Sequence, residues 1–297
     1  MNNATLDALL AELGLPPESV HGCTAVGGGD SHRAYRLSAA NRQFFVKASG
    51  PKHYGSLVAE AAGLGAIAAA RKVPVPAVVS LGGIESEGWL VLEWLDLAPL
   101  PSEASATLGR QLAELHAVAS ERYGWPADNW LGKAPQWNQW CPSWVEFWRT
   151  QRLAPLVARF EAAGPNTARQ RLVSAAVDAS IACLAHHDPL PSLLHGDLWG
   201  GNAAYDARRE RPVVFDPAPY YGDRETDLAM AALFGGFDAA FFSAYESRAP
   251  LPSGHEQRRT LYQFYHALNH VNLFGDGYNG MLDRLARAIV GNATSVT

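Results

Sequence analysis

The feature that most constrains this chain is a glycine-rich segment around residue 200 that carries polar side chains at fixed spacing. Asp197 and Asn202 lie in the run His-Gly-Asp-Leu-Trp-Gly-Gly-Asn, and Asp216 closes a short apolar run beyond it. An Asp, an Asn and a second Asp in this order are typical of phosphoryl-transfer sites, where the first Asp orients the attacking hydroxyl and the others hold magnesium on ATP. The spacing predicts a catalytic Asp197 and the metal ligands Asn202 and Asp216. A glycine-rich turn is the alternative that any one of these residues alone would favour.

A lysine and a glutamate upstream fit the same chemistry. Lys47 ends an apolar, strand-like run, and Glu60 follows inside an alanine-rich helical segment. A strand lysine held by a helix glutamate grips the α- and β-phosphates of ATP in kinase-type sites. Either residue alone would more often be a surface charge. Their order and spacing ahead of Asp197 predict a nucleotide-binding pair.

A triple glycine is a second candidate contact for the phosphates. Gly27, Gly28 and Gly29 lie between two predicted strands, where backbone N–H groups could approach phosphate oxygens. The run lacks the full G-x-G-x-x-G pattern, so a flexible hairpin tip is the alternative.

The end of the last predicted N-terminal strand is a candidate contact for the base. Glu93, Trp94 and Leu95 lie where the composition changes. Adenine would hydrogen-bond to the backbone around Glu93 and Leu95, although any edge strand would look similar.

The apolar patterning predicts an α+β chain with a sheet part and a helical part, and the kinase-type motifs above indicate a protein-kinase-like, two-lobe fold. A small antiparallel β lobe with one main helix is expected over 1–95 as the nucleotide-binding part. A larger, mostly helical lobe is expected over 96–297 as the catalytic and substrate-binding part. We predict strands at 20–26, 34–37, 43–48, 77–81 and 88–94, a short hairpin at 202–206 and 212–216, and helices at 6–13, 55–71, 102–119, 144–162, 167–186, 225–233, 237–247, 256–273 and 280–290. Thr5 and Ser102 are the expected caps of the first and third helices.

Composition argues against several other classes. The formal net charge of -5 is spread without a basic stripe, so we expect no nucleic acid partner. No apolar run approaches the ~20 residues that span a bilayer, so we expect no membrane partner. The first residues lack the pattern of a signal peptide. Cys23, Cys141 and Cys183 are far apart without metal-like spacing, which predicts free thiols in a reducing cytoplasm.

Other polar and aromatic residues admit two interpretations each. His266 and His270 are four residues apart on one predicted helix, and a hydrogen-bonded core or a site wall is favoured over zinc because no third ligand has fitting spacing. Glu225 and Asp227 begin a predicted helix, where acidic side chains complement the helix dipole. Six of the nine Trp residues lie in 125–148, as a substrate wall or, more commonly, as packing.

Over most of its length the chain resembles the fructosamine kinase (ketosamine 3-kinase) family, relatives of aminoglycoside and choline kinases. The resemblance rests on runs at 27–29, 44–47, 128–132, 144–148, 195–202, 216–225, 227–237 and 261–270. The His-Gly-Asp motif alone indicates only the wider group of small-molecule kinases. The runs at 216–237 and 261–270 narrow the choice to this family.

The resemblance implies ATP-dependent phosphorylation of the 3-hydroxyl of a ketosamine, a sugar adduct on an amine, and hence deglycation repair. ATP and Mg2+ are implied with it, as are the roles given above to Lys47, Glu60, Asp197, Asn202 and Asp216. Trp199, two residues after Asp197, would lie beside the sugar or the amine, and His266 is a further candidate substrate contact. Some family members carry a Cys after the glycines, where this chain has Asp30, so a thiol switch is not expected.

The sequence leaves several alternatives open. The acceptor could be another small hydroxylated amine, such as an aminoglycoside or choline, or the chain could be a pseudokinase that binds nucleotide without transfer. Nucleotidyl transfer to protein is a remote third option. The preferred ketose is open, and so is the choice between a small-molecule and a protein-bound ketosamine. We expect a monomer or weak homodimer.

Overall fold

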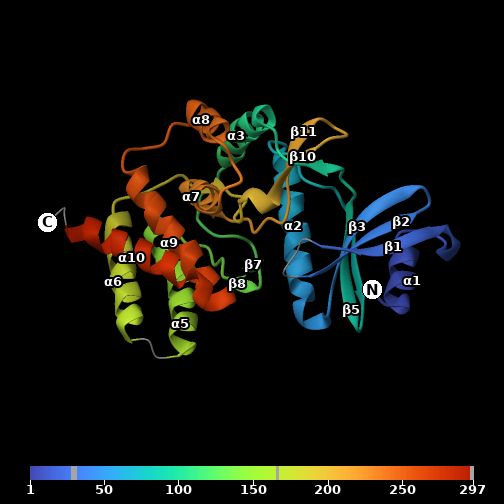
Figure 1. Ribbon diagram of the computed structural model, residues 1–297, viewed down its shortest axis with the longest axis horizontal. Coiled ribbons are helices and arrows are strands. Elements are labelled where there is room, and N and C mark those ends of the chain that lie inside the picture. The colour runs from blue at the N-terminus through green and yellow to red at the C-terminus, as the bar shows by residue number, and fades with distance from the viewer. Residues whose placement is uncertain (28–31, 165–166, 295–297) are drawn as a thin grey trace.

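The computed structural model describes residues 1–27, 32–164 and 167–294 (Figure 1). Its N-terminal part is a five-stranded antiparallel sheet in the order β1-β2-β3-β5-β4. The strands are β1 Val20–Val26, β2 Arg33–Ala39, β3 Arg42–Ser49, β4 Val78–Ile84 and β5 Glu87–Glu93. The five strands predicted here are therefore present, and the predicted α+β class is confirmed.

Two helices cover opposite faces of this sheet because successive side chains of a strand point to opposite sides. Val46 of β3 packs on one face against Leu9 of α1 (Asn3–Glu12). Leu90 of β5 packs on the other face against Leu57 of α2 (Tyr54–Ala70). Figure 1 shows α2 between the sheet and the helical part of the molecule. Residues on the α2 face of the sheet are therefore placed to face the helical part.

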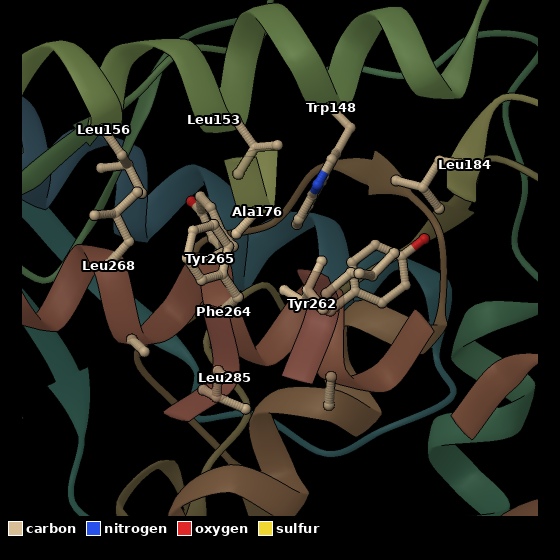
Figure 2. Packing of buried hydrophobic residues seen from close by; sticks show 14 of the residues in the cluster. Trp148, Leu153, Leu156, Ala176, Leu184, Tyr262, Phe264, Tyr265, Leu268 and Leu285 are labelled. Atoms are coloured by element: carbon tan, nitrogen blue, oxygen red, sulfur yellow. The ribbon is translucent and has the colours of Figure 1, made fainter. Parts of the chain in front are cut away.

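The C-terminal part is built mainly from helices. They are α3 Ser102–His116, α4 Trp144–Phe147, α5 Ala154–Ala162, α6 Thr167–Leu184, α7 Glu225–Phe234, α8 Ala239–Arg248, α9 His255–Phe274 and α10 Asn279–Thr294. The core lies around α9, whose Tyr262, Tyr265 and Leu268 pack against Trp148 and Leu153 (Figure 2). Within the described ranges, no helix combines the length and apolarity needed to cross a membrane.

A π-helical segment, η3 (Trp148–Leu153), divides the single helix predicted over 144–162. The wider turn brings Trp148, Arg152 and Leu153 all into the interior. The Arg152 guanidinium donates to Trp137 O at 2.5 Å and Asn138 Oδ1 at 2.7 Å, and it lies over the ring of Tyr220. A buried arginine with these partners gave no signal in the apolar periodicity.

Both predicted caps are wrong, the first by three residues and the second by one. Asn2 caps α1 by accepting from Thr5 N at 2.8 Å, so Thr5 lies inside the helix. Ser102 is the first residue of α3 and makes no cap bond, because Pro101 occupies the N-cap position. The hydroxyl of Ser102 instead bonds to Asp238, the N-cap of α8.

Short strands between the helices complete the fold. The hairpin β10 (Ala203–Asp206) and β11 (Arg211–Val214) pairs with β6 (Leu97–Ala98), giving the order β11-β10-β6. The hairpin β7 (Asn129–Leu131) and β8 (Ala134–Gln136) and the pair β9 (Ser192–Leu193) and β12 (Tyr221–Gly222) are similarly short. Of these, only the β10–β11 hairpin was predicted, because two or three residues carry no periodic signal. The three cysteines are free, as predicted.

Candidate active site

The loop that carries Asp197 is shaped by a glycine with a left-handed backbone. Gly196 has φ +82°, and a Cβ placed there would lie 1.9 Å from Ala218 O. Ala218 N donates to His195 O at 2.9 Å, so the loop and the chain after Asp216 run in close contact. Only glycine fits at position 196 without moving one of the two segments.

A buried carboxylate of α7 anchors the same loop. Asp227 accepts from His195 N at 2.7 Å and from Gly196 N at 2.9 Å. It also accepts from the Nε2 atom of His116, on α3, at 3.1 Å. Asp227 is 2% exposed, and these donors lower its pKa although burial alone would raise it. The carboxylate that our sequence interpretation placed at a helix start therefore holds the loop that carries Asp197.

The hydrogen bonds beyond Asp227 assign the proton on His116. Arg224 Nη1 donates to Tyr245 OH at 3.3 Å, and the hydroxyl lies 2.8 Å from His116 Nδ1. Because the ionised Asp227 carboxylate can only accept, the Nε2 atom of His116 carries a proton and donates it to Asp227. Helices α3, α7 and α8 are thus joined behind the loop.

The ring of His195 joins the loop to the segment before Asp216. Its Nε2 lies 3.1 Å from Phe215 O, a pure acceptor, so Nε2 carries the proton. Its Nδ1 accepts from Asp197 N at 3.3 Å. Burial lowers the pKa of His195, in agreement with a neutral ring. This histidine therefore connects Asp197 to the residue that precedes Asp216.

Asp197 and Asn202, two of the predicted site residues, are in direct contact. Asn202 Nδ2 donates to Asp197 Oδ2 at 3.0 Å and to Asp197 O at 2.9 Å. Burial and then the charge of Asp216 raise the pKa of Asp197 to about 7. A carboxylate with a pKa near neutrality is suited to proton transfer at physiological pH.

Lys47 lies between two carboxylates that are far apart in the sequence. Its Nζ donates to Glu60 Oε1 at 2.7 Å and to Asp216 Oδ1 at 2.5 Å. Burial would lower the pKa of Lys47, but the charges of Glu60 and Asp216 outweigh it and raise the pKa. Burial, together with Asp216, raises the pKa of Glu60 to about 7 against the effect of Lys47. The sheet, α2 and the segment after β11 meet at this lysine.

Close packing of α2 holds Glu60 near Asp216. A Cβ on Gly63, one turn after Glu60, would lie 2.8 Å from Cδ of Pro219. Asp216 itself has φ +55°, which an L residue adopts at a cost. Helix α2 and the segment 216–219 therefore pack in close contact.

The predicted base-binding segment begins at Glu93, the last residue of β5, and contacts the β10–β11 hairpin. Glu93 accepts from Ala77 N at 3.0 Å and from Arg209 Nη2 at 2.5 Å. Trp94 Nε1 donates to Asp96 Oδ1 at 3.2 Å. Glu93, Trp94 and Leu95 are all partly exposed, so ligand atoms can reach this segment. Among the predicted phosphate-binding glycines, Gly28 and Gly29 lie outside the described residues, as does Asp30. No described atom lies within 4 Å of a Cβ placed on Gly27.

Trp199 is an exposed aromatic residue next to the catalytic loop. Its side chain is 41% exposed, and its ring fills the space beside Gly201, where a Cβ would lie 2.2 Å away. Gly200 N donates to Gly235 O at 3.1 Å, which joins this loop to the end of α7. The exposed ring agrees with a substrate contact, which stays a prediction.

His266 is enclosed rather than open to the site. It is 3% exposed, and its nearest polar partner among the described atoms is the Thr226 backbone, with which neither ring nitrogen makes a hydrogen bond of regular geometry. Burial and then His270 lower its pKa to about 3. This environment favours the core interpretation over the substrate contact.

Of the tryptophan cluster, Trp144 and Trp148 are core residues, whereas Trp137 is 42% exposed.

A second polar cluster lies at the start of α7, and it resembles a metal site only in composition. His187, Asp223 and Glu225 offer ligand atoms within 4.8 Å of one another. Both oxygens of Glu225 accept from Arg258, at 2.9 and 2.8 Å. Asp223 Oδ2 accepts from Tyr262 OH at 2.5 Å. Because these oxygens are engaged, the cluster is a buried ion-pair network that fastens α7 to α9.

Comparison with known proteins gives the same picture across the whole chain. The family model for fructosamine kinase matches residues 2–291. A probable ketoamine kinase of Synechocystis is 39% identical over 264 residues, which cover 89% of this chain and 88% of that protein. A chloroplastic protein-ribulosamine 3-kinase of Arabidopsis thaliana is 37% identical over 259 residues, 86% of this chain and 78% of that protein.

Solved structures agree in fold. The structure of a protein from Thermobifida fusca described as a fructosamine-3-kinase has a TM-score of 0.85 at 33% identity, covering 98% of this chain and 99% of that one. The choline kinase LicA of Streptococcus pneumoniae has a TM-score of 0.68 at 17% identity, covering 96% of this chain and 98% of that one. The second likeness concerns the fold alone, and it confirms the protein-kinase-like architecture.

Proposed function

Because this chain belongs to the fructosamine kinase family, we propose that it transfers the γ-phosphate of ATP to the 3-hydroxyl of a ketosamine. It is an ATP-dependent phosphotransferase that acts on a sugar hydroxyl. The ketosamine acceptor follows from the relatives that are named for ketoamines and ribulosamines. Phosphorylation of such an adduct would serve deglycation.

The observation that carries this proposal is the convergence of five predicted polar residues. Lys47 contacts Glu60 and Asp216, and Asn202 contacts Asp197, although the five come from the sheet, α2 and two later segments. A glycine-rich turn alone would not require Lys47 to reach Asp216. Phosphoryl transfer requires Lys47 and Asp216 to lie close together, since the lysine and the metal ligands act on the same triphosphate.

Asp197 aligns the acceptor in the proposed mechanism. Asn202 holds Asp197 Oδ2 at 3.0 Å, which leaves Oδ1 for the hydroxyl of the sugar. The hydroxyl oxygen forms a bond to the γ-phosphorus as the bond to the bridging oxygen of ADP breaks. The hydroxyl proton passes to Asp197, and ADP leaves. Most of the rate comes from positioning and from charge stabilisation.

The donor atoms near Asp216 fit magnesium. The Asp216 side chain is 36% exposed. Because the amide nitrogen of Asn202 donates to Asp197, the Oδ1 atom of Asn202 is available as a ligand. Oxygen donors of this kind suit Mg2+. Bound magnesium would neutralise charge on the phosphates, while Lys47 would bind the α- and β-phosphates.

A panel of acceptors tests the proposed function. We expect ATP turnover with ribulose-lysine or fructose-lysine and none with an aminoglycoside or choline, measured as ADP release with magnesium. Turnover with the aminoglycoside or choline alone would assign the chain to another small-molecule kinase. ATP binding without turnover on any acceptor would indicate a binding module instead.

A further inference from the structure

The tip of the β10–β11 hairpin forms an ion pair with Glu93, the last residue of β5. Arg209, in the turn of the hairpin, donates from Nη2 to Glu93 Oε2 at 2.5 Å and from Nη1 to Asp206 Oδ2 at 2.9 Å. Asp206 is 1% exposed and also accepts from Arg209 N at 3.3 Å, so the turn is closed around the arginine. The guanidinium thereby bridges two carboxylates from different parts of the chain.

Glu93 is held on its other side as well. Its Oε1 accepts from Ala77 N at 3.0 Å, and its own N–H donates to Ala77 O at 3.0 Å. Its carboxylate therefore lies between the start of β4 and the hairpin. Both carboxylate oxygens accept a hydrogen bond, which fixes the orientation of the side chain.

Backbone pairing extends the connection along the segment after Glu93. Ala207 N donates to Asp96 O at 3.0 Å, and β6 pairs with β10 through Tyr205 with Ala98 and Asp206 with Leu97. The hairpin and residues 93–98 thus form one unit. The two proposed metal ligands flank the same hairpin, since Asn202 precedes β10 and Asp216 follows β11.

We propose that Arg209 is a positioning residue for the nucleotide: it fixes the base-binding segment 93–95 relative to the metal ligands Asn202 and Asp216. This inference rests on the proposed function, because it takes the base to bind at 93–95 and the phosphates at Lys47. One short hairpin then sets the spacing between the two ends of ATP. Arg209 touches neither the base nor the phosphates in this role.

The size of the effect follows from the exposure of the pair. The side chains of Arg209 and Glu93 are 41% and 22% exposed, so the pair is only partly shielded from solvent. Because partly exposed pairs are weak, the loss of this one should weaken nucleotide binding by about two- to fivefold, which corresponds to about 0.4 to 1 kcal/mol. Positioning should act on affinity for ATP more than on kcat.

The test compares Arg209→Ala with Arg208→Ala. Arg208 is the neighbouring exposed residue, and its described hydrogen bond, to Asp206, comes from the backbone. Both variants remove one positive charge from the same turn, so they share any effect of overall charge. Calorimetric titration with Mg-ATP and Mg-GTP measures affinity without an acceptor. Thermal unfolding establishes that each variant is folded.

We expect Arg209→Ala to weaken Mg-ATP binding and to narrow the preference for ATP over GTP, while Arg208→Ala changes neither. Arg209→Lys should fall between them, because it retains the charge but loses the forked geometry. Glu93→Gln should weaken binding similarly, and combining it with Arg209→Ala should add little. Equal affinities in the two alanine variants would overturn the inference. A wild-type chain that binds no Mg-ATP would instead contradict the proposed function.

Discussion

At the scale of single residues, the buried carboxylate of Asp227 does more for the site than its position in the sequence suggests. It collects three donors, two from the catalytic loop and one from His116. Sequence spacing alone predicted five polar residues that the structure brings into contact in two groups, because phosphoryl-transfer chemistry fixes their order. It could not identify Asp227 or His116, whose partners lie far along the chain and depend on how α3 and α7 pack.

Replacing Asp227 with Asn should therefore damage both the fold and the site. The amide can accept from one loop N–H but presents its own N–H groups to the other, leaving buried donors unpaired. We expect a loss of about 2 to 4 kcal/mol in unfolding free energy and a large fall in kcat. Urea denaturation with Asp178→Asn, an exposed residue of α6, as the control would measure it. Equal stability of the two variants would contradict this role.

The raised pKa of Asp197 has consequences for both activity and stability. Transfer needs the ionised carboxylate, so kcat/KM should fall as pH drops below about 7. The folded chain holds this proton more tightly than the unfolded chain, so ionising Asp197 costs stability as pH rises from the ordinary aspartate value toward 7. A rise in pH toward 7 should therefore increase kcat/KM while it lowers the free energy of unfolding.

Asp197→Asn separates the two effects. We expect loss of turnover by about 10²- to 10⁴-fold with Mg-ATP binding retained. We also expect unfolding free energy to exceed that of the wild type by about 1 to 2 kcal/mol at pH 8, allowing for partial exposure, with little difference at pH 4. Thermal unfolding without nucleotide at the two pH values measures this. A variant less stable than the wild type at pH 8 would show that Asp197 is not strained by burial.

At the scale of elements, α2 is the part that brings the sheet and the site together. Its apolar face packs on β5, Glu60 reaches Lys47, and Gly63 meets Pro219. The helix itself was predicted from its periodicity to within one residue at each end. Its close contact with the segment after Asp216 was not, because a glycine in an alanine-rich helix does not show what packs on it.

Two glycines of α2 give a matched test of this contact. A Cβ on Gly63 would lie 2.8 Å from Pro219, whereas no atom of the described residues lies within 4 Å of a Cβ on Gly65. Gly65→Ala should stabilise the chain by about 0.5 to 1 kcal/mol through helix propensity. Gly63→Ala gains the same propensity but forces α2 away from the site, so we expect lower stability and weaker Mg-ATP binding. Equal behaviour of the two variants in denaturation and titration would rule out a tight α2 contact.

At the scale of the whole molecule, sequence patterns predicted the class and the main elements, but not the connections between them. Helices and strands with several turns or alternations were found near their observed bounds. The strands of two or three residues, the π-helical segment around Arg152 and the ion pairs of Arg209 and Arg258 were not found, since each depends on tertiary partners. The division between 1–95 and 96–297 stays a prediction, and β6, just beyond it, already pairs with the hairpin of the second part.

Nucleotide should stabilise the folded chain as a whole if it bridges the sheet and the helical part. A ligand that binds only the folded state at 100 times its Kd adds about 2.7 kcal/mol, which is measurable as a rise in Tm. We expect this rise with ATP and magnesium together and a much smaller one after EDTA removes the metal. An equal rise with and without magnesium would contradict the assignment of Asn202 and Asp216 as metal ligands.

The central claim is that this chain phosphorylates ketosamines at the 3-hydroxyl with Asp197 as the catalytic residue. The most direct measurement is to incubate ribulose-lysine and fructose-lysine with Mg-ATP and to locate the added phosphate by mass spectrometry and ³¹P NMR. We predict one phosphate on the 3-oxygen with the wild type and none at comparable rates with Asp197→Asn. Phosphate at another position, or equal product from the variant, would contradict the account.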